Sequence, residues 1–144
     1  MNERYIRQTM IPEIGEAGQE KLKNAKVLIV GIGGLGSPIS LYLTAAGVGQ
    51  IGLIDDDIVS KSNLQRQILY TEAEIGQSKV ECACRRLSAL NSSTRFETYP
   101  NRFTPDNANR LVSAYDIIVD GCDNAATRYL IDDVCSRFKK PYVY

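Results

Sequence analysis

The stretch KVLIVGIGGLGSP, residues 26–38, decides the fold of this chain. Its first five residues form a short apolar run rich in β-branched side chains that ends at a glycine, as buried parallel strands do. Gly31, Gly33 and Gly36 then form a GxGxxG pattern, and the stretch 35–46 is predicted to be a helix. A strand, a glycine turn and a helix in this order predict the first half of a nucleotide-binding βαβ unit.

The same alternation of apolar runs and helical periodicity continues along the rest of the chain. Further strands are predicted at residues 50–54, 94–99, 115–119 and 141–144, and further helices at 77–90, 105–114 and 124–138. Strands separated by helices of roughly 10 to 15 residues form right-handed crossovers and a parallel sheet. The predicted fold is therefore α/β: a doubly wound, mainly parallel Rossmann-like sheet with helices on both faces.

The sequence also predicts two parts of unequal size. Residues 1–25 are expected to form an N-terminal helical segment with its helix at residues 15–25, and residues 26–144 the Rossmann-like domain. The chain stops at Tyr144, within or just after an apolar strand, whereas domains normally end in an exposed polar segment. We therefore expect more protein to follow this point.

The balance of charges excludes several kinds of partner. Seventeen Lys and Arg face seventeen Asp and Glu, so the formal net charge is +0, and the isoelectric point is about 6.3. No overall field would hold a nucleic-acid backbone or an anionic membrane. No apolar run reaches the roughly 18 to 20 residues of a membrane span, and the charged start MNERYIRQTM is not a secretion signal. We expect a cytoplasmic protein that binds neither nucleic acid nor membrane.

The chain contains no histidine and four cysteines. The lack of histidine excludes Cys2His2 zinc sites, Cys-His catalysis and Ser-His-Asp catalysis within these residues. The cysteine spacing does not match a zinc ribbon, and free cysteines are among the most buried residue types. We expect Cys82, Cys84, Cys122 and Cys135 to be small core residues.

An acidic residue follows the second predicted strand at the spacing of a dinucleotide-binding motif. Parallel α/β sheets bind ligands beyond the carboxyl ends of their strands. Asp55 stands there, 55 − 36 = 19 residues after Gly36, where a carboxylate can accept a hydrogen bond from a ribose hydroxyl. These features alone would predict NAD; the alternative is that the glycines serve only close helix–strand packing.

Amide and cationic side chains beyond that strand favour a ligand with more phosphate than NAD. Residues 62–67, SNLQRQ, carry amides and a guanidinium, and Lys79 stands at the start of the next helix. ATP presents three phosphates whose charge requires Arg, Lys and a divalent cation. The alternative is that Arg66 and Lys79 are ordinary solvated charges.

The fourth predicted strand leads into a second acidic segment, DGCDN, at the same edge of the sheet. Asp123 is a candidate Mg²⁺ ligand, since Mg²⁺ is often held by one or two carboxylates plus substrate phosphates. The alternative is that Asp123 or Asn124 only caps the following helix.

Seven motifs together resemble the ThiF/MoeB/HesA family, bacterial relatives of ubiquitin-activating enzymes. They are RYIRQ (4–8), GQEKL (18–22), VGIGGLGSP (30–38), AGVGQIGLIDDD (46–57), SNLQRQ (62–67), IGQSK (75–79) and DGCDNAATR (120–128). The resemblance implies an adenylyltransferase that uses MgATP to activate the C-terminal Gly-Gly carboxylate of a ubiquitin-like sulfur-carrier protein, with release of pyrophosphate.

The resemblance also implies roles for individual residues. Residues 26–144 become an ATP-binding domain, in which Gly34 and Asp55 hold the nucleotide and Asp123 binds Mg²⁺. In a homodimer, Arg7 would reach the triphosphate bound by the neighbouring protomer. The residues expected to be catalytic are Arg7, Arg66, Lys79 and Asp123. Those expected to bind the nucleotide are Gly31, Gly33, Gly34, Gly36, Asp55, Asp57, Ser62, Asn63, Leu64, Gln65, Arg66, Lys79, Asp123 and Asn124.

Some features of the family are not within these residues. A carrier-binding crossover loop, a thiol-reactive cysteine and a paired CxxC zinc site would all follow Tyr144, so this stretch alone is expected to bind nucleotide without adenylating a carrier. The run LIDDDIVSKSNLQRQILY (53–70) favours the thiamin branch of the family. The alternatives are the same chemistry on the molybdopterin carrier, an NAD-dependent oxidoreductase, and an inactive module that only docks a ubiquitin-like partner.

Overall fold

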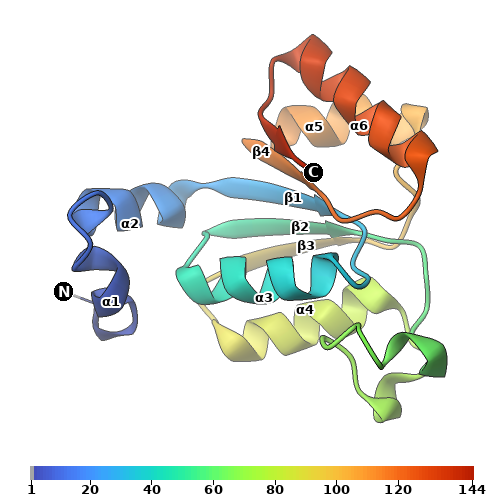
Figure 1. Cartoon of the computed structure of the whole chain (residues 1–144), viewed down its shortest axis with the longest axis horizontal. Coiled ribbons are helices and arrows are strands. Elements are labelled where there is room, and N and C mark those ends of the chain that lie inside the picture. Colours follow the sequence, from blue (N-terminus) through green and yellow to red (C-terminus); the bar gives the residue numbers. More distant parts are fainter. Residues whose placement is uncertain (1) are drawn as a thin grey trace.

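The computed structural model describes residues 2–144 as one five-stranded parallel sheet with helices on both faces (Figure 1). The strand order is β3-β2-β1-β4-β5, so the chain reverses direction across the sheet next to β1. The strands are β1 (Lys26–Val30), β2 (Gln50–Ile54), β3 (Arg95–Tyr99), β4 (Ile117–Asp120) and β5 (Tyr142–Val143). The α-helices are α1 (Ile6–Thr9), α2 (Gly15–Asn24), α3 (Gly36–Ala46), α4 (Lys79–Leu90), α5 (Pro105–Ala114) and α6 (Ala125–Phe138), with short 3-10 turns η1 (Glu3–Tyr5), η2 (Lys61–Asn63) and η3 (Glu72–Glu74).

Alternate residues of the central strand β1 point to the two faces of the sheet. Val27 and Ile29 join a cluster that includes side chains of α3 and α4, whereas Leu28 and Val30 join a cluster with α5 and α6. Figure 1 shows these two helix pairs on opposite sides of the strands. Both faces are therefore covered, which explains why β1 is apolar at every position after its first residue.

The predicted doubly wound α/β fold is confirmed, and all strand pairs are parallel. The strands at 26–30 and 50–54 and the helix at 105–114 have the predicted bounds, and the bounds of the other elements differ by at most two residues. β4 begins two residues later than predicted because Tyr115 is the C-cap of α5 and lies buried against the sheet.

The N-terminal helices lie beyond the end of the sheet at which the strands begin (Figure 1). Two amides attach them to the C-terminal end of α3: Gln8 Nε2 and Gln19 Nε2 each donate to the Ala46 carbonyl at 3.0 Å. Tyr5 is buried, and its hydroxyl accepts a hydrogen bond from Asn91 Nδ2 at 2.8 Å. The segment is thus held by polar contacts, and its division from residues 26–144 stays a prediction.

The cysteine prediction is confirmed in part. Cys82 and Cys135 are fully buried on α4 and α6, and Cys122 is buried in the loop after β4. Cys84 is only half-buried, since Ala83 takes the core-facing position of that turn. None of the helices among residues 2–144 has the length and apolarity needed to cross a membrane.

Candidate functional site

A cavity of about 1020 Å³ lies at the edge of the sheet where β1, β2 and β4 end. The glycine turn after β1 forms its floor, and the loops after β2, β3 and β4 form its walls. This is the position at which a parallel α/β sheet binds ligands, next to the reversal in strand order. The expected site residues that line it are Gly31, Gly33, Gly34, Asp55, Asp57, Arg66, Lys79, Asp123 and Asn124.

The glycine turn depends on close backbone contacts. Gly31 has a φ of 90°, a left-handed conformation that favours glycine. A Cβ at Gly36 would collide with the Gly31 carbonyl oxygen, so Gly36 is needed for α3 to start directly against the turn. Gly36 itself is buried and does not line the cavity, whereas Gly33 and Gly34 do. The turn therefore presents backbone at the start of a helix, where phosphate binds favourably.

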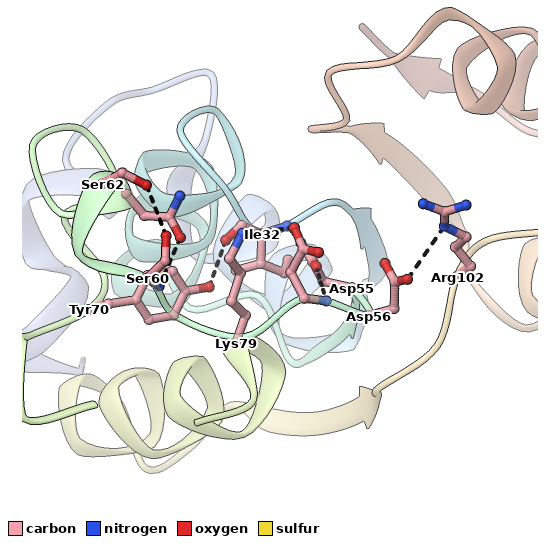
Figure 2. Close-up of polar contacts among 10 residues, drawn as sticks. Ile32, Asp55, Asp56, Ser60, Ser62, Tyr70, Lys79 and Arg102 are labelled. Carbon is pink, nitrogen blue, oxygen red and sulfur yellow. Dashed lines mark hydrogen bonds and ion pairs between the residues drawn. The ribbon is translucent and has the colours of Figure 1, made fainter. Parts of the chain in front are cut away.

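Both backbone polar groups of Ile32, in this turn, are hydrogen-bonded to side chains (Figure 2). Its N–H donates to Asp55 Oδ2 at 2.8 Å, and its carbonyl accepts from the Tyr70 hydroxyl at 2.6 Å. The other Asp55 oxygen accepts from the Asp57 N–H at 2.9 Å. Burial raises the pKa of Tyr70, so the hydroxyl stays a donor. Sequence reasoning missed Tyr70, because no periodic pattern marks its orientation in an irregular segment.

Lys79 is a buried cation in the wall of the cavity. Its side chain is 5% exposed and its Nζ lies 3.2 Å from Asp57 Oδ2, the carboxylate of which is 68% exposed. Its own N–H donates to the Asp57 carbonyl at 3.1 Å, which fixes the start of α4 against the loop after β2. A buried ammonium group with one exposed carboxylate partner can bind a second anion without a large movement of the lysine side chain.

Arg66 and Gln67 extend across the glycine turn from the loop after β2. The carbons of the Arg66 side chain lie about 3.6 Å from the point that a Cβ of Gly34 would occupy, and Gln67 Nε2 lies 3.3 Å from the equivalent point at Gly33. Arg66 is exposed, whereas Gln67 is 4% exposed. Gln67 was not predicted as a site residue, because the alternating amides of SNLQRQ do not show which one faces the turn.

Four other predicted residues of the same motif do not line the cavity. Asn63 Oδ1 accepts from the Ser60 N–H at 3.0 Å and so caps η2, and the hydroxyls of Ser60 and Ser62 lie 3.1 Å apart (Figure 2). Leu64 packs partly buried against the core, and Gln65 is exposed. Their side chains shape the loop that carries Arg66, and a direct role in nucleotide binding stays a prediction.

The carboxylates after β4 have different environments. Asp120 is fully buried; its oxygens accept from the Cys122 N–H at 2.9 Å and from Arg128 Nε at 2.8 Å. Asp123 is exposed in the cavity wall, and Asn124 caps α6 by accepting from the Thr127 N–H at 2.8 Å. The capping role considered for both residues therefore falls to Asn124. Burial raises the pKa of Cys122 to about 11, so its thiol stays neutral near pH 7.

Arg7 is the one predicted catalytic residue that the chain does not bring to the cavity. It is exposed on α1, whereas the cavity lies at the opposite end of the strands (Figure 1). Its predicted action on a neighbouring protomer stays a prediction.

The wall formed by the loop after β3, from Asn101 to Pro105, was also not predicted. Arg102 Nε lies 3.4 Å from Asp56 Oδ2 and joins this wall to the loop after β2 (Figure 2). Both side chains are largely exposed, so this ion pair contributes little to stability.

The fold and the site together define a Rossmann-type nucleotide-binding protein in which Arg66 and Lys79 line the cavity with the glycine turn. The sequence matches the ThiF family over residues 5–144, and the chain belongs to that family.

The chain is similar to longer proteins. It is 48% identical over 142 residues to the sulfur carrier protein adenylyltransferase of Thermus thermophilus, with 99% of this chain and 52% of that protein covered. It is 49% identical over 141 residues to the "Probable adenylyltransferase/sulfurtransferase MoeZ" of Mycobacterium tuberculosis, with 98% and 36% covered. The chain therefore spans about half or less of the length of these relatives.

A solved structure shares the fold. The tRNA N6-threonylcarbamoyladenosine dehydratase TcdA of E. coli, in complex with ATP, superposes with a TM-score of 0.89 at 30% identity, with 96% of this chain and 57% of that chain covered.

The contrast between the two carboxylates after β4 can be tested by stability measurements. Asp120→Asn should lower the free energy of unfolding by about 2 to 3 kcal/mol, because a buried charge-assisted bond to Arg128 is lost. Asp123→Asn should change it by less than about 0.5 kcal/mol. Urea denaturation of both variants measures this difference. A loss for Asp123→Asn as large as that for Asp120→Asn would mean that Asp123 is structural.

Proposed function

We propose that the protein containing this chain is an adenylyltransferase that uses ATP to activate the C-terminal carboxylate of a ubiquitin-like sulfur-carrier protein. The observation that carries the proposal is the convergence of Arg66, the buried Lys79 and the glycine turn on one cavity. Two cations beside a turn that already offers backbone to phosphate suit a triphosphate better than the bridging pyrophosphate of NAD. The names of both relatives, which include adenylyltransferase, support the same chemistry.

The reaction requires positioning and charge neutralisation more than a protein nucleophile. A carboxylate oxygen of the carrier forms a bond to the α-phosphorus of ATP, and the bond from that phosphorus to the oxygen bridging to the β-phosphate breaks. The electron pair leaves with pyrophosphate, and the products are an acyl-adenylate and pyrophosphate. Lys79 and Arg66 would stabilise the charge that develops on the phosphoryl oxygens. The absence of histidine from the sequence and the neutral Cys122 thiol agree with such a mechanism.

The residues present fit one Mg²⁺ ion at Asp123. Carboxylate oxygens of Asp55, Asp56 and Asp57 lie within 4.8 Å of one another, but both Asp55 oxygens accept backbone N–H groups and Asp57 pairs with Lys79. Asp123 is exposed to the cavity on the opposite wall. Mg²⁺ bound there with the phosphates would add neutralising charge to the triphosphate.

The names of the two relatives help to choose between the thiamin and molybdopterin branches of the family. Neither relative's name supports the thiamin branch that the sequence favoured, and together they agree better with the alternative, the molybdopterin carrier. We therefore propose carrier activation without a thiamin assignment. The two cations beside the turn disfavour the oxidoreductase and the inactive docking module, because neither needs a triphosphate site.

Pyrophosphate exchange tests the proposal directly. The full-length protein should incorporate labelled pyrophosphate into ATP only when the carrier is present. Lys79→Ala and Asp123→Ala should each lower the exchange rate by about 100-fold or more, because Lys79 would neutralise charge in the transition state and Asp123 would hold the Mg²⁺ that does the same. Lys21→Ala, an exposed lysine on α2, is the matched control and should exchange at the wild-type rate. Carrier-dependent exchange that persists in Lys79→Ala would contradict the role of Lys79.

A mixing experiment tests the proposed homodimer with a shared site. In an equimolar mixture of Arg7→Ala and Lys79→Ala full-length protomers, each mixed dimer should hold one complete site, whereas both parent dimers hold none. Random assortment predicts about one quarter of the wild-type activity. A mixture no more active than either parent would rule out the contribution of Arg7 across the dimer.

A further inference from the structure

Arg128, in the first turn of α6, is bonded to two parts of the chain that precede this helix. Its Nε donates to Asp120 Oδ2 at 2.8 Å, and its Nη2 donates to the Cys122 carbonyl at 3.5 Å. Asp120 is the last residue of β4 and its side chain is fully buried, whereas Cys122 belongs to the loop that follows. One guanidinium group therefore joins the end of the strand, the loop and the start of the helix.

The loop between β4 and α6 has further hydrogen bonds on both sides of Asp123. The Gly121 N–H donates to the last carbonyl of β1 at 2.8 Å, and the Cys122 N–H donates to the second Asp120 oxygen at 2.9 Å. On the other side, Asn124 caps α6. Asp123 is exposed to the cavity between these residues, so the hydrogen-bonded backbone around it sets the direction of its carboxylate.

Arg128 is not among the described residues that line the cavity, so it can act on a ligand only through the loop. The planar guanidinium group holds its N–H donors in fixed directions, which allows it to bond the Asp120 carboxylate and the loop carbonyl at the same time. It also compensates the charge of Asp120. A buried carboxylate that loses its cation is strongly destabilising, so without Arg128 the strand end and the loop would rearrange to expose Asp120 to water.

We propose that Arg128 is a positioning residue of this site: through its bonds to Asp120 and Cys122, it holds the loop so that the Asp123 carboxylate faces Mg²⁺ bound with the nucleotide. This inference rests on the proposed function and deepens it, because it assigns part of the metal dependence to a residue outside the cavity. The loss of Arg128 should weaken the metal contact and leave the other nucleotide contacts in place.

The Mg²⁺ dependence of ATP binding separates this role from a purely structural one. In the full-length protein, Arg128→Met should raise the Mg²⁺ concentration for half-maximal ATP binding about 10-fold or more, as expected when a partner of a metal ligand is removed. The affinity for ATP in EDTA should stay within about twofold of wild type, because Arg66, Lys79 and the glycine turn are distant from the change. Calorimetry measures both quantities at a temperature at which circular dichroism shows every variant to be folded.

Arg137→Met is the matched control. Arg137 is an arginine of the same helix that pairs with a carboxylate, Asp133, at 3.3 Å, and it is not among the described residues that line the cavity. This variant should bind ATP as the wild type does, with and without Mg²⁺.

A double-mutant cycle with Asp123→Asn tests whether Arg128 acts through Asp123. Asp123→Asn should weaken the Mg²⁺ dependence at least as much as Arg128→Met does. Adding Arg128→Met to Asp123→Asn should then change it no further, because the carboxylate that Arg128 positions is gone. Equal effects of Arg128→Met in both backgrounds would overturn the inference.

Asp120→Asn/Arg128→Met carries the same test if Arg128→Met alone does not fold, since the double variant leaves no unpaired buried carboxylate. It keeps an acceptor for the Cys122 N–H but lacks the guanidinium, so its Mg²⁺ dependence should also be weakened. Wild-type Mg²⁺ dependence in the folded variant would overturn the inference and leave the proposed function standing. A wild-type protein that binds no ATP would overturn the proposed function together with this inference.

Discussion

Close backbone packing between the end of β1, the start of α3 and the end of β4 is the constraint on which the site depends. A Cβ at Gly31 would press on the backbone of Gly121, and one at Gly36 would collide with the Gly31 carbonyl. Because Gly31, Gly36 and Gly121 all lack side chains, the loop after β4, which carries Asp123, lies directly against the glycine turn. Arg66 lies over Gly34 from the loop after β2, and Lys79 lines the same cavity from the start of α4, so charges from distant parts of the sequence surround one cavity.

Polar groups around this cavity are divided between those that hold the protein together and those that are exposed to a ligand. Asp120 is buried with Arg128, and Asp55 accepts two backbone N–H groups, so these carboxylates maintain the shape of the loops. Asp123 and Arg66 are exposed at the cavity, and Gln67 is buried beside it without a partner for its Oε1. Exposed charged groups such as Asp123 and Arg66 are free to bind a metal ion or an anion, which is how a nucleotide site differs from a structural polar network.

The sequence predicted most of the fold and nine of the residues that line the cavity, for physical reasons that differ by region. Strands and helices have periodic apolar patterns, so β2 and α5 were predicted with their observed bounds. Glycines and acids at strand ends lie at fixed places in such a sheet, so Gly33, Asp55 and Asp123 were expected at the cavity where they lie. Residues 58–76 form mostly turns, in which neighbouring side chains face in unrelated directions. There Asn63 caps a turn, and Gln67 and Tyr70 contact the glycine turn without any pattern that predicted it.

Calorimetric titration with nucleotides tests the central claim, that this cavity is built for a triphosphate with a divalent cation. The chain should bind ATP in a Mg²⁺-dependent manner, and NAD should give no heat of binding under the same conditions. This result would follow from the two cations, the glycine turn and the exposed Asp123 acting on one ligand. Binding of NAD without a metal requirement would contradict the claim and assign the same fold to dinucleotide chemistry.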